Sequence, residues 1–341
     1  MGILCRASDN VEIVLAHSAT IGANWSVDDR SPLHCFGQAA EGVVSRLCTT
    51  STDDGSTDKM NYTKQLIVEP EARVRLKQFD PAGHGKGGAE QDADQELAAV
   101  KARIGDLQRK MYGDNRHALL IVLQGLDAAG KDGVCWHVIG GMDPQGCKVQ
   151  GFKAPTAAEA AHDFLWRIHP HAPAKGEVAV FNRSHYEDVL VTRVHQLVPR
   201  TVWERRYDLI NDWERLLAVE NGTTILKFCL VISKEEQLKR FAERLNDPHR
   251  QWKISDSDYK ERACFDDYLD AFDEALERTS TAHAPWFTIP CDHKWFRNLA
   301  VAHIVLDAME ALDLHYPEPT VDLEQIRREY HAAAGGKGKQ R

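Results

Sequence analysis

The residues best suited to carry out chemistry form a glycine-rich stretch that contains one lysine and two aspartates. The stretch Gly125-Leu-Asp-Ala-Ala-Gly-Lys-Asp132 fits the pattern G-x-x-x-x-G-K. Glycines let backbone N–H groups turn toward a phosphate, and the N-terminus of a following helix adds partial positive charge. Lys131 would bring a full charge to a phosphoryl group in transfer. We therefore predict a phosphate-binding loop, lined by Gly125, Ala128, Ala129, Gly130, Lys131 and Gly133.

Two carboxylates accompany this loop. Asp127 lies inside it, and Asp132 occupies the position where Ser or Thr ordinarily coordinates Mg²⁺. Two carboxylates beside a polyphosphate would repel it at close range, unless a divalent cation stands between them. Mg²⁺ prefers oxygen ligands, typically one or two carboxylates with phosphate oxygens. We therefore expect Asp127 and Asp132 to bind Mg²⁺, for which Mn²⁺ can substitute; the alternative is a strand-to-helix turn without a ligand.

A second polar cluster runs from Asn182 to Glu187 and follows an apolar run that predicts a strand. Arg183 can hold phosphate oxygens with its planar guanidinium group. Asn182 stands where P-loop enzymes carry an acid for Mg²⁺. Glu187, one helical turn beyond Arg183, can orient the guanidinium or reach the metal. Arg193 continues the same helix and is predicted as a further phosphate ligand. The alternative is a helix cap with surface ion pairs.

The segment 234–253 is basic, although the whole chain has a formal net charge of −9. Arg240 and Arg244 are four residues apart and share a helix face. Many phosphoryl-transfer enzymes close a basic lid over the phosphoryl donor. We predict such a lid at about 234–258, with Arg240, Arg244 and Lys253 as phosphate ligands; the alternative is a solvated amphipathic helix.

The acceptor side of the reaction is expected near the second predicted strand. Lys153 follows that strand, and Asp163 and Trp166 lie in the segment after it. An acid and an aromatic ring can receive a nucleobase, so we predict a nucleotide-acceptor site that also includes Asn182 and Glu187. The alternative for Trp166 is a place in the core.

Short apolar runs alternate with helical patterns over most of the chain. This alternation predicts an α/β fold with a five-stranded parallel sheet, helices on both faces, and a ligand site beyond the carboxyl ends of the strands. Thr156 and Glu159 have the spacing of a capping box. The predicted strands cover 118–123, 149–152, 178–181, 224–232 and 287–290, and the predicted helices cover 89–109, 156–167, 186–194, 202–220, 234–245, 258–278 and 296–312.

Composition limits the domain organisation and the partners. Residues 1–59 end in a Ser/Thr-rich linker, so we predict a disordered or non-essential extension, with a small packed arm as the alternative. Residues 60–116 are expected to form an arm and helix, 117–316 the kinase domain and 317–341 a tail. The net charge of −9 argues against a nucleic-acid binder. Short apolar runs argue against a membrane span, and the eight cysteines without a C-x-x-C pair favour a soluble cytoplasmic protein.

From about Met60 to Leu314 the sequence resembles the polyphosphate kinase type 2 family. The motifs that carry the resemblance are long and follow one another in order. They are Gly125–Gly133, Asp143–Gly146, Phe152–Pro155, Phe164–Arg167, Phe181–Ser184, Arg193–His195, Arg244–Pro248 and Trp252-Lys253.

This resemblance implies Mg²⁺-dependent transfer of a phosphoryl group between inorganic polyphosphate and an adenine nucleotide. It implies a thymidylate-kinase-like P-loop core with a helical lid, and a homo-oligomer, either a dimer or a tetramer. It assigns catalytic roles to Asp127, Lys131, Asp132 and Arg183. Many members have Asp where this chain has Asn182, and the Asn version looks like the branch that accepts AMP as well as ADP.

Two other functions stay open from the residues alone. One is an ATP-dependent P-loop kinase that acts on a nucleoside monophosphate or another small acceptor. The other is a non-catalytic nucleotide- or phosphate-sensing module. The paired acids beside Lys131 speak against the second, because binding alone does not require them.

Overall fold

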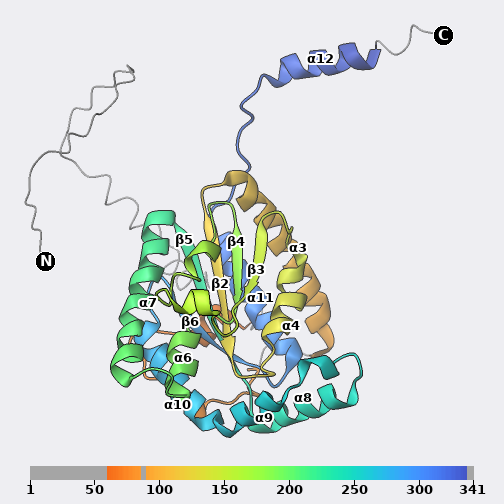
Figure 1. Ribbon diagram of the computed structural model, residues 1–341. Coiled ribbons are helices and arrows are strands. Elements are labelled where there is room, and N and C mark those ends of the chain that lie inside the picture. The colour runs from red at the N-terminus through yellow and green to blue at the C-terminus, as the bar shows by residue number, and fades with distance from the viewer. Residues whose placement is uncertain (1–59, 86–89, 336–341) are drawn as a thin grey trace, which may run out of the picture.

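A computed structural model of the chain describes residues 60–85 and 90–335, so the predicted extension 1–59 lies outside the described residues. Its centre is a six-stranded sheet in the order β1-β6-β5-β2-β4-β3 (Figure 1). Strands β2 to β6 are parallel, which confirms the predicted α/β sheet. The strands are β1 (Ile67–Val68), β2 (Ala118–Gly125), β3 (Cys147–Gly151), β4 (Val178–Asn182), β5 (Thr223–Val231) and β6 (Trp286–Pro290).

The sixth strand, β1, pairs antiparallel with β6 at the edge of the sheet. This strand is not among the five predicted from the sequence. Two residues are too short to show a hydrophobic period, and only the pairing with β6 defines them as a strand.

Helices cover both faces of the sheet, and alternate residues of β2 point to each face. Leu119, Ile121 and Leu123 pack in one core with α3, α4 and α11, while Leu120 and Val122 pack in a second core with α6, α7 and α10. Burial on both faces explains the unbroken apolar run of this strand. The helices are α2 (Tyr62–Leu66), α3 (Glu90–Asp114), α4 (Lys131–His137), α5 (Ala157–Ala160), α6 (Glu187–Val194), α7 (Arg200–Asn221), α8 (Lys234–Asn246), α9 (Asp256–Ala263), α10 (Phe265–Thr279), α11 (Lys294–Glu310) and α12 (Leu323–Gly335), with short 3₁₀ turns at η1 (Leu76–Gln78), η2 (Ile139–Gly141), η3 (His169–His171) and η4 (Gln251–Lys253).

The predicted helix 156–167 is wrong beyond its first turn. The capping box of Thr156 and Glu159 is present, but the helix ends at Ala160. Asp163 then forms a turn of its own, in which its Oδ1 accepts a hydrogen bond of 3.0 Å from the N–H of Leu165. Local side-chain capping of this kind competes with helix continuation.

Two other boundaries differ from the predictions. The predicted helix 258–278 is two helices, α9 and α10, which meet at Cys264. The predicted tail 317–341 contains α12, which projects from the body of the molecule (Figure 1). The predicted arm shares the core of the kinase domain, since Val100 and Ile104 of α3 pack in the same cluster as α11. None of the helices in the described residues has the length and apolar character of a membrane span.

Candidate active site

The predicted phosphate loop connects the end of β2 to the start of α4. Its backbone is left-handed at Gly130, with φ of +111°, and at Ala128, with φ of +64°. A Cβ on Gly130 would lie 1.9 Å from Nη1 of Arg297, so this position has no room for a side chain. A left-handed alanine is strained, and such strain is concentrated at functional sites.

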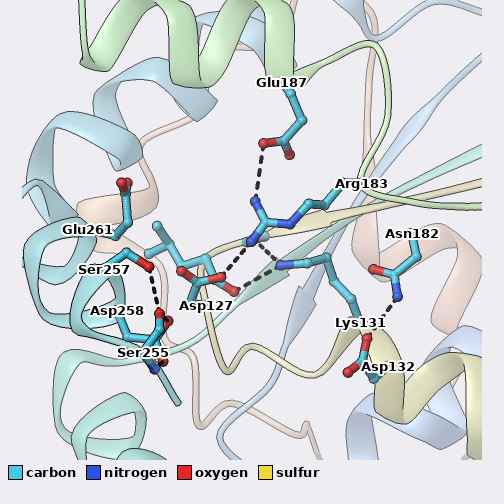
Figure 2. A network of polar contacts seen from close by, with 12 residues as sticks. Asp127, Lys131, Asp132, Asn182, Arg183, Glu187, Ser255, Ser257, Asp258 and Glu261 are labelled. Carbon is cyan, nitrogen blue, oxygen red and sulfur yellow. Dashed lines mark hydrogen bonds and ion pairs between the residues drawn. The ribbon is translucent and has the colours of Figure 1, made fainter. Parts of the chain in front are cut away.

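Lys131 is buried at the first position of α4, and its ammonium group turns back onto the loop. Nζ donates hydrogen bonds to the backbone oxygens of Gly125, at 2.6 Å, and Leu126, at 3.2 Å (Figure 2). Burial, together with the nearby positive charge of Arg183, lowers the pKa of Lys131 to about 8, against the raising effect of Asp127. The ammonium is thus held by carbonyl dipoles and free of a carboxylate within 4.0 Å in the described part of the chain.

Arg183 joins the phosphate loop to α6. Its Nη2 donates to Oδ1 of Asp127 at 2.7 Å, and its Nη1 donates to Oε2 of Glu187 at 3.2 Å (Figure 2). Arg183 also has a left-handed backbone, with φ of +63°, directly after β4. The predicted pairing of Arg183 with Glu187 is therefore present, and the acid inside the loop is the second partner.

Asp132 lies between two donors. Nδ2 of Asn182 donates to its Oδ1 at 2.8 Å, and Nζ of Lys253 donates to its Oδ2 at 3.0 Å. Partial burial raises the pKa of Asp132, but these two hydrogen bonds outweigh that effect and leave the pKa below its ordinary value. Asp132 is therefore a carboxylate at neutral pH, and Lys253 brings η4 back to the phosphate loop.

Arg240 is placed differently from the prediction. Its side chain is buried, and its guanidinium donates to the backbone oxygens of Ala128, Ala129, Cys291 and Asp292 and to the carboxylate of Glu236. All five N–H groups are therefore occupied, and Arg240 holds the loop from behind instead of offering donors to a phosphate. The sequence predicted Arg240 on an exposed face of a lid helix. Its inward orientation depends on tertiary contacts, which helix spacing does not reveal.

Other predicted residues lie apart from the loop network. Arg193 pairs with Glu274 at 2.7 Å and stacks over Trp203. Arg244 is 3.6 Å from Asp258. The contacts of these two arginines attach α6 and α8 to neighbouring helices, so their assignment as phosphate ligands stays a prediction.

Three of the predicted acceptor residues, Lys153, Asp163 and Trp166, lie on the surface, whereas Asn182 and Glu187 belong to the loop network. Trp166 is 47% exposed and stacks on His162, which excludes the alternative that it belongs to the core. Lys153 is exposed, and its backbone oxygen accepts a hydrogen bond from Arg167. The side chain of Asp163 accepts a hydrogen bond within its own turn.

Two further residues contact the loop and were missed in the sequence. Nε2 of Gln237 donates to the backbone oxygen of Asp127 at 3.0 Å. Nη1 of Arg297 lies 3.4 Å from the backbone oxygen of Ala129. Neither residue belongs to a loop pattern, and the only sequence signal is that Gln237 lies on the same face of α8 as Arg240 and Arg244.

The arrangement can bind a chain of phosphates. Backbone N–H groups at the N-terminus of α4, the ammonium of Lys131 and the guanidinium of Arg183 all lie around one loop. No cluster of three or more His, Cys, Asp or Glu that could hold a metal occurs in residues 60–85 and 90–335. Mg²⁺ needs only one or two carboxylates when phosphates supply the other oxygens, so Asp127 and Asp132 fit it as donors.

Known proteins resemble this chain over the part that contains the phosphate loop and the sheet. The profile of the family described as polyphosphate kinase 2 (PPK2) matches residues 88–317. An AMP/ADP-polyphosphate phosphotransferase of Meiothermus ruber is 46% identical over 264 residues, which cover 77% of this chain and 98% of that protein. An ADP-polyphosphate phosphotransferase of Rhodopseudomonas palustris is 45% identical over 230 residues, which cover 64% of this chain and 79% of that protein.

A solved structure has the same fold. The crystal structure of polyphosphate kinase 2 from Arthrobacter aurescens TC1 aligns with a TM-score of 0.76 at 44% identity, and the alignment covers 80% of this chain and 96% of that one. The phosphate loop, the paired acids and the arginine after β4 all fall within residues 88–317, which the family profile matches. The chain belongs to the polyphosphate kinase 2 family.

Proposed function

We propose that this protein transfers a phosphoryl group between inorganic polyphosphate and an adenine nucleotide, with AMP, ADP or both as acceptors. The observation that carries the proposal is the single array around the phosphate loop, in which Lys131, Arg183 and Lys253 alternate with Asp127 and Asp132. Linear polyphosphate carries a row of negative charges, and a row of cations around one loop suits it. The names of the Meiothermus and Rhodopseudomonas relatives support the choice of substrates.

The chain's own groups would act mainly by position and charge. Lys131 exchanges the carbonyls of Gly125 and Leu126 for oxygens of the transferred phosphoryl group, where its charge stabilises the transition state. Arg183, held by Glu187 and Asp127, would present its guanidinium to the phosphate chain. The N–H groups at the start of α4 bind the adjacent phosphate.

Asp127 and Asp132 are the residues that would hold Mg²⁺, or Mn²⁺ in its place. When bound, the ion would neutralise negative charge on the donor and acceptor phosphates. Asn182 donates to Asp132 and so fixes the orientation of that carboxylate. The proposal includes a homo-oligomer, dimer or tetramer, in the cytoplasm, for which the support is the resemblance to the family and the free cysteines among the described residues.

The test is to incubate AMP or ADP with long-chain polyphosphate and Mg²⁺ and to measure ADP and ATP formed. We expect product with polyphosphate as the sole donor, and none when EDTA removes the metal. Product with ATP as donor but none with polyphosphate would instead support the nucleoside monophosphate kinase. The absence of turnover with both donors would support the sensing module.

A further inference from the structure

Buried cations in this molecule fall into two groups. Five Lys or Arg side chains are buried in the part of the chain that the structure describes, namely Lys131, Arg167, Lys227, Arg240 and Arg297. Arg167, Lys227 and Arg240 each have a carboxylate within 4.0 Å. Lys131 and Arg297 have none among the described residues, and both contact the phosphate loop. A buried charge is costly unless it is paired, so an unpaired one needs an explanation.

Arg297 lies directly beneath the loop. It comes from the first turn of α11, is 3% exposed, and donates from Nη2 to Oδ1 of Asn298 at 2.8 Å. A Cβ on Gly130 would be 1.9 Å from its Nη1, and a Cβ on Gly133 would be 2.7 Å from its Nη2. The guanidinium is therefore pressed against the backbone whose opposite side is the proposed phosphate site, and a side chain at Gly130 or Gly133 would displace it.

The neighbours of Arg297 do not neutralise it. Burial lowers the pKa of Arg297, and Arg240 adds to this effect, while the thiol of Cys291 acts in the opposite direction. That thiol is itself neutral at physiological pH, because burial raises its pKa to about 12. Arg240 is compensated by Glu236, which leaves one full positive charge under the loop.

We propose that Arg297 strengthens phosphate binding electrostatically through the loop backbone, with the bound polyphosphate as its missing counter-ion. The proposal rests on the proposed function of the loop and assigns it a second buried charge behind Lys131. Charge under a low-dielectric layer is poorly screened, so it attracts an anion on the other side without touching it. The free protein carries the cost of the unpaired charge, and ligand binding removes that cost.

The test compares three variants by calorimetric titration with inorganic tripolyphosphate, which requires no turnover. Arg297→Met removes the charge, Arg297→Gln removes it but keeps a hydrogen-bond donor for Ala129, and Arg297→Lys keeps the charge without the planar fork. We expect binding about ten- to a hundredfold weaker for Arg297→Met and Arg297→Gln, and most of the affinity retained in Arg297→Lys. If Arg297→Met does not fold, the affinity of Arg297→Gln is compared with that of the parent and of Arg297→Lys instead.

Thermal unfolding without ligand separates a binding role from a structural one. Arg297→Met should melt no lower than the parent protein, whereas Lys227→Met, which breaks a paired charge, should melt well below it. Tripolyphosphate should raise the melting temperature of the parent more than that of Arg297→Met.

Either of two results would overturn the proposal: parent-like affinity in Arg297→Gln, or Arg297→Lys binding as weakly as Arg297→Met. A parent that binds tripolyphosphate but transfers nothing to AMP or ADP would refute the proposed function and leave this inference intact. A parent that binds no tripolyphosphate would refute both.

Discussion

Lys227 in β5 and Lys131 at the start of α4 are both buried ammonium groups, but their surroundings differ. Nζ of Lys227 donates to Glu214 at 2.6 Å, to the hydroxyl of Tyr186 at 2.9 Å and to the backbone oxygen of Thr279 at 2.6 Å. Three N–H groups thus meet three acceptors, one of them charged. Within residues 60–85 and 90–335, Lys131 donates only to two backbone carbonyls of its own loop.

The backbone repeats this contrast. Around the phosphate loop, Ala128 and Arg183 adopt left-handed conformations that residues other than glycine rarely adopt. Lys227 lies in a regular parallel strand that pairs with β2 and β6. Saturated charge on regular backbone characterises a region that stabilises the fold. Unsaturated charge on strained backbone characterises a region whose missing partner is a ligand.

The largest effect that would test this contrast is on stability. Lys227→Met leaves the fully buried Glu214 without its counter-ion, and we expect the free energy of unfolding to fall by about 3 to 5 kcal/mol. Urea unfolding measures it. Lys227→Met combined with Glu214→Leu should recover much of the loss, since both charges are then gone. An unfolding free energy within about 1 kcal/mol of the parent in Lys227→Met would show that the pair is not what distinguishes this region.

The corresponding change at the loop should act on rate. Lys131→Met removes a charge from the reacting phosphoryl group, and we expect turnover to fall on the order of 10³-fold, or about 4 kcal/mol of barrier. Stability should not fall, because the variant no longer buries an unpaired charge. Steady-state kinetics with polyphosphate and ADP measure the rate. Lys148→Met, at an exposed lysine paired with Glu177, is the control. Activity of Lys131→Met within about tenfold of the parent would contradict the assigned role.

The pH dependence of binding sharpens the contrast further. The pKa of Lys131 is lowered to about 8 by burial, and a bound polyanion should raise it. Tripolyphosphate binding at pH 8.5 should therefore take up about half a proton or more, and affinity should fall as the pH rises past 8. Titration in two buffers with different ionisation enthalpies measures the uptake, which Lys131→Met should abolish. Proton release on binding, instead of uptake, would contradict this prediction.

The same lowered pKa affects stability in the opposite sense. An unfolded lysine keeps its proton to about pH 10.5, while the folded one loses it near 8. The cost of burying Lys131 is therefore full below pH 8 and declines between pH 8 and 10.5.

The sequence predicted the elements whose signals are local. The apolar run of β2, the glycines after it and the capping box at Thr156 are contained in short stretches, and all are present. The phosphate loop and the Arg183–Glu187 pair follow from that local order, since parallel strands bring their carboxyl ends to one edge.

Signals that depend on tertiary contacts were missed or misread. Arg240 was read as a lid cation because helix spacing reveals a shared face but not which face points inward. Arg297 carries no motif of its own, and only the distance from Gly130 and Gly133 shows that it underlies the loop. The helix predicted after Thr156 failed because the hydrogen bond from Leu165 to Asp163 forms a turn that competes with it.

The smallest expected effect concerns the contact between Lys253 and Asp132, at 3.0 Å, whose side chains are 35% and 66% exposed. A pair this exposed is worth at most about 1 kcal/mol. If Asp132 is a metal ligand, Lys253 competes with Mg²⁺ for it and favours phosphate once the ion has bound. Lys253→Met should then reduce the Mg²⁺ concentration for half-maximal activity about two- to threefold and weaken tripolyphosphate binding by a similar factor. Lys239→Met on α8, where Lys239 pairs with Glu236, should change neither. If Lys253→Met instead strengthened or weakened the binding of both Mg²⁺ and tripolyphosphate, Lys253 would not alternate between Asp132 and the phosphate. The contact between Lys253 and Asp132 would then not belong with the contacts that a ligand replaces.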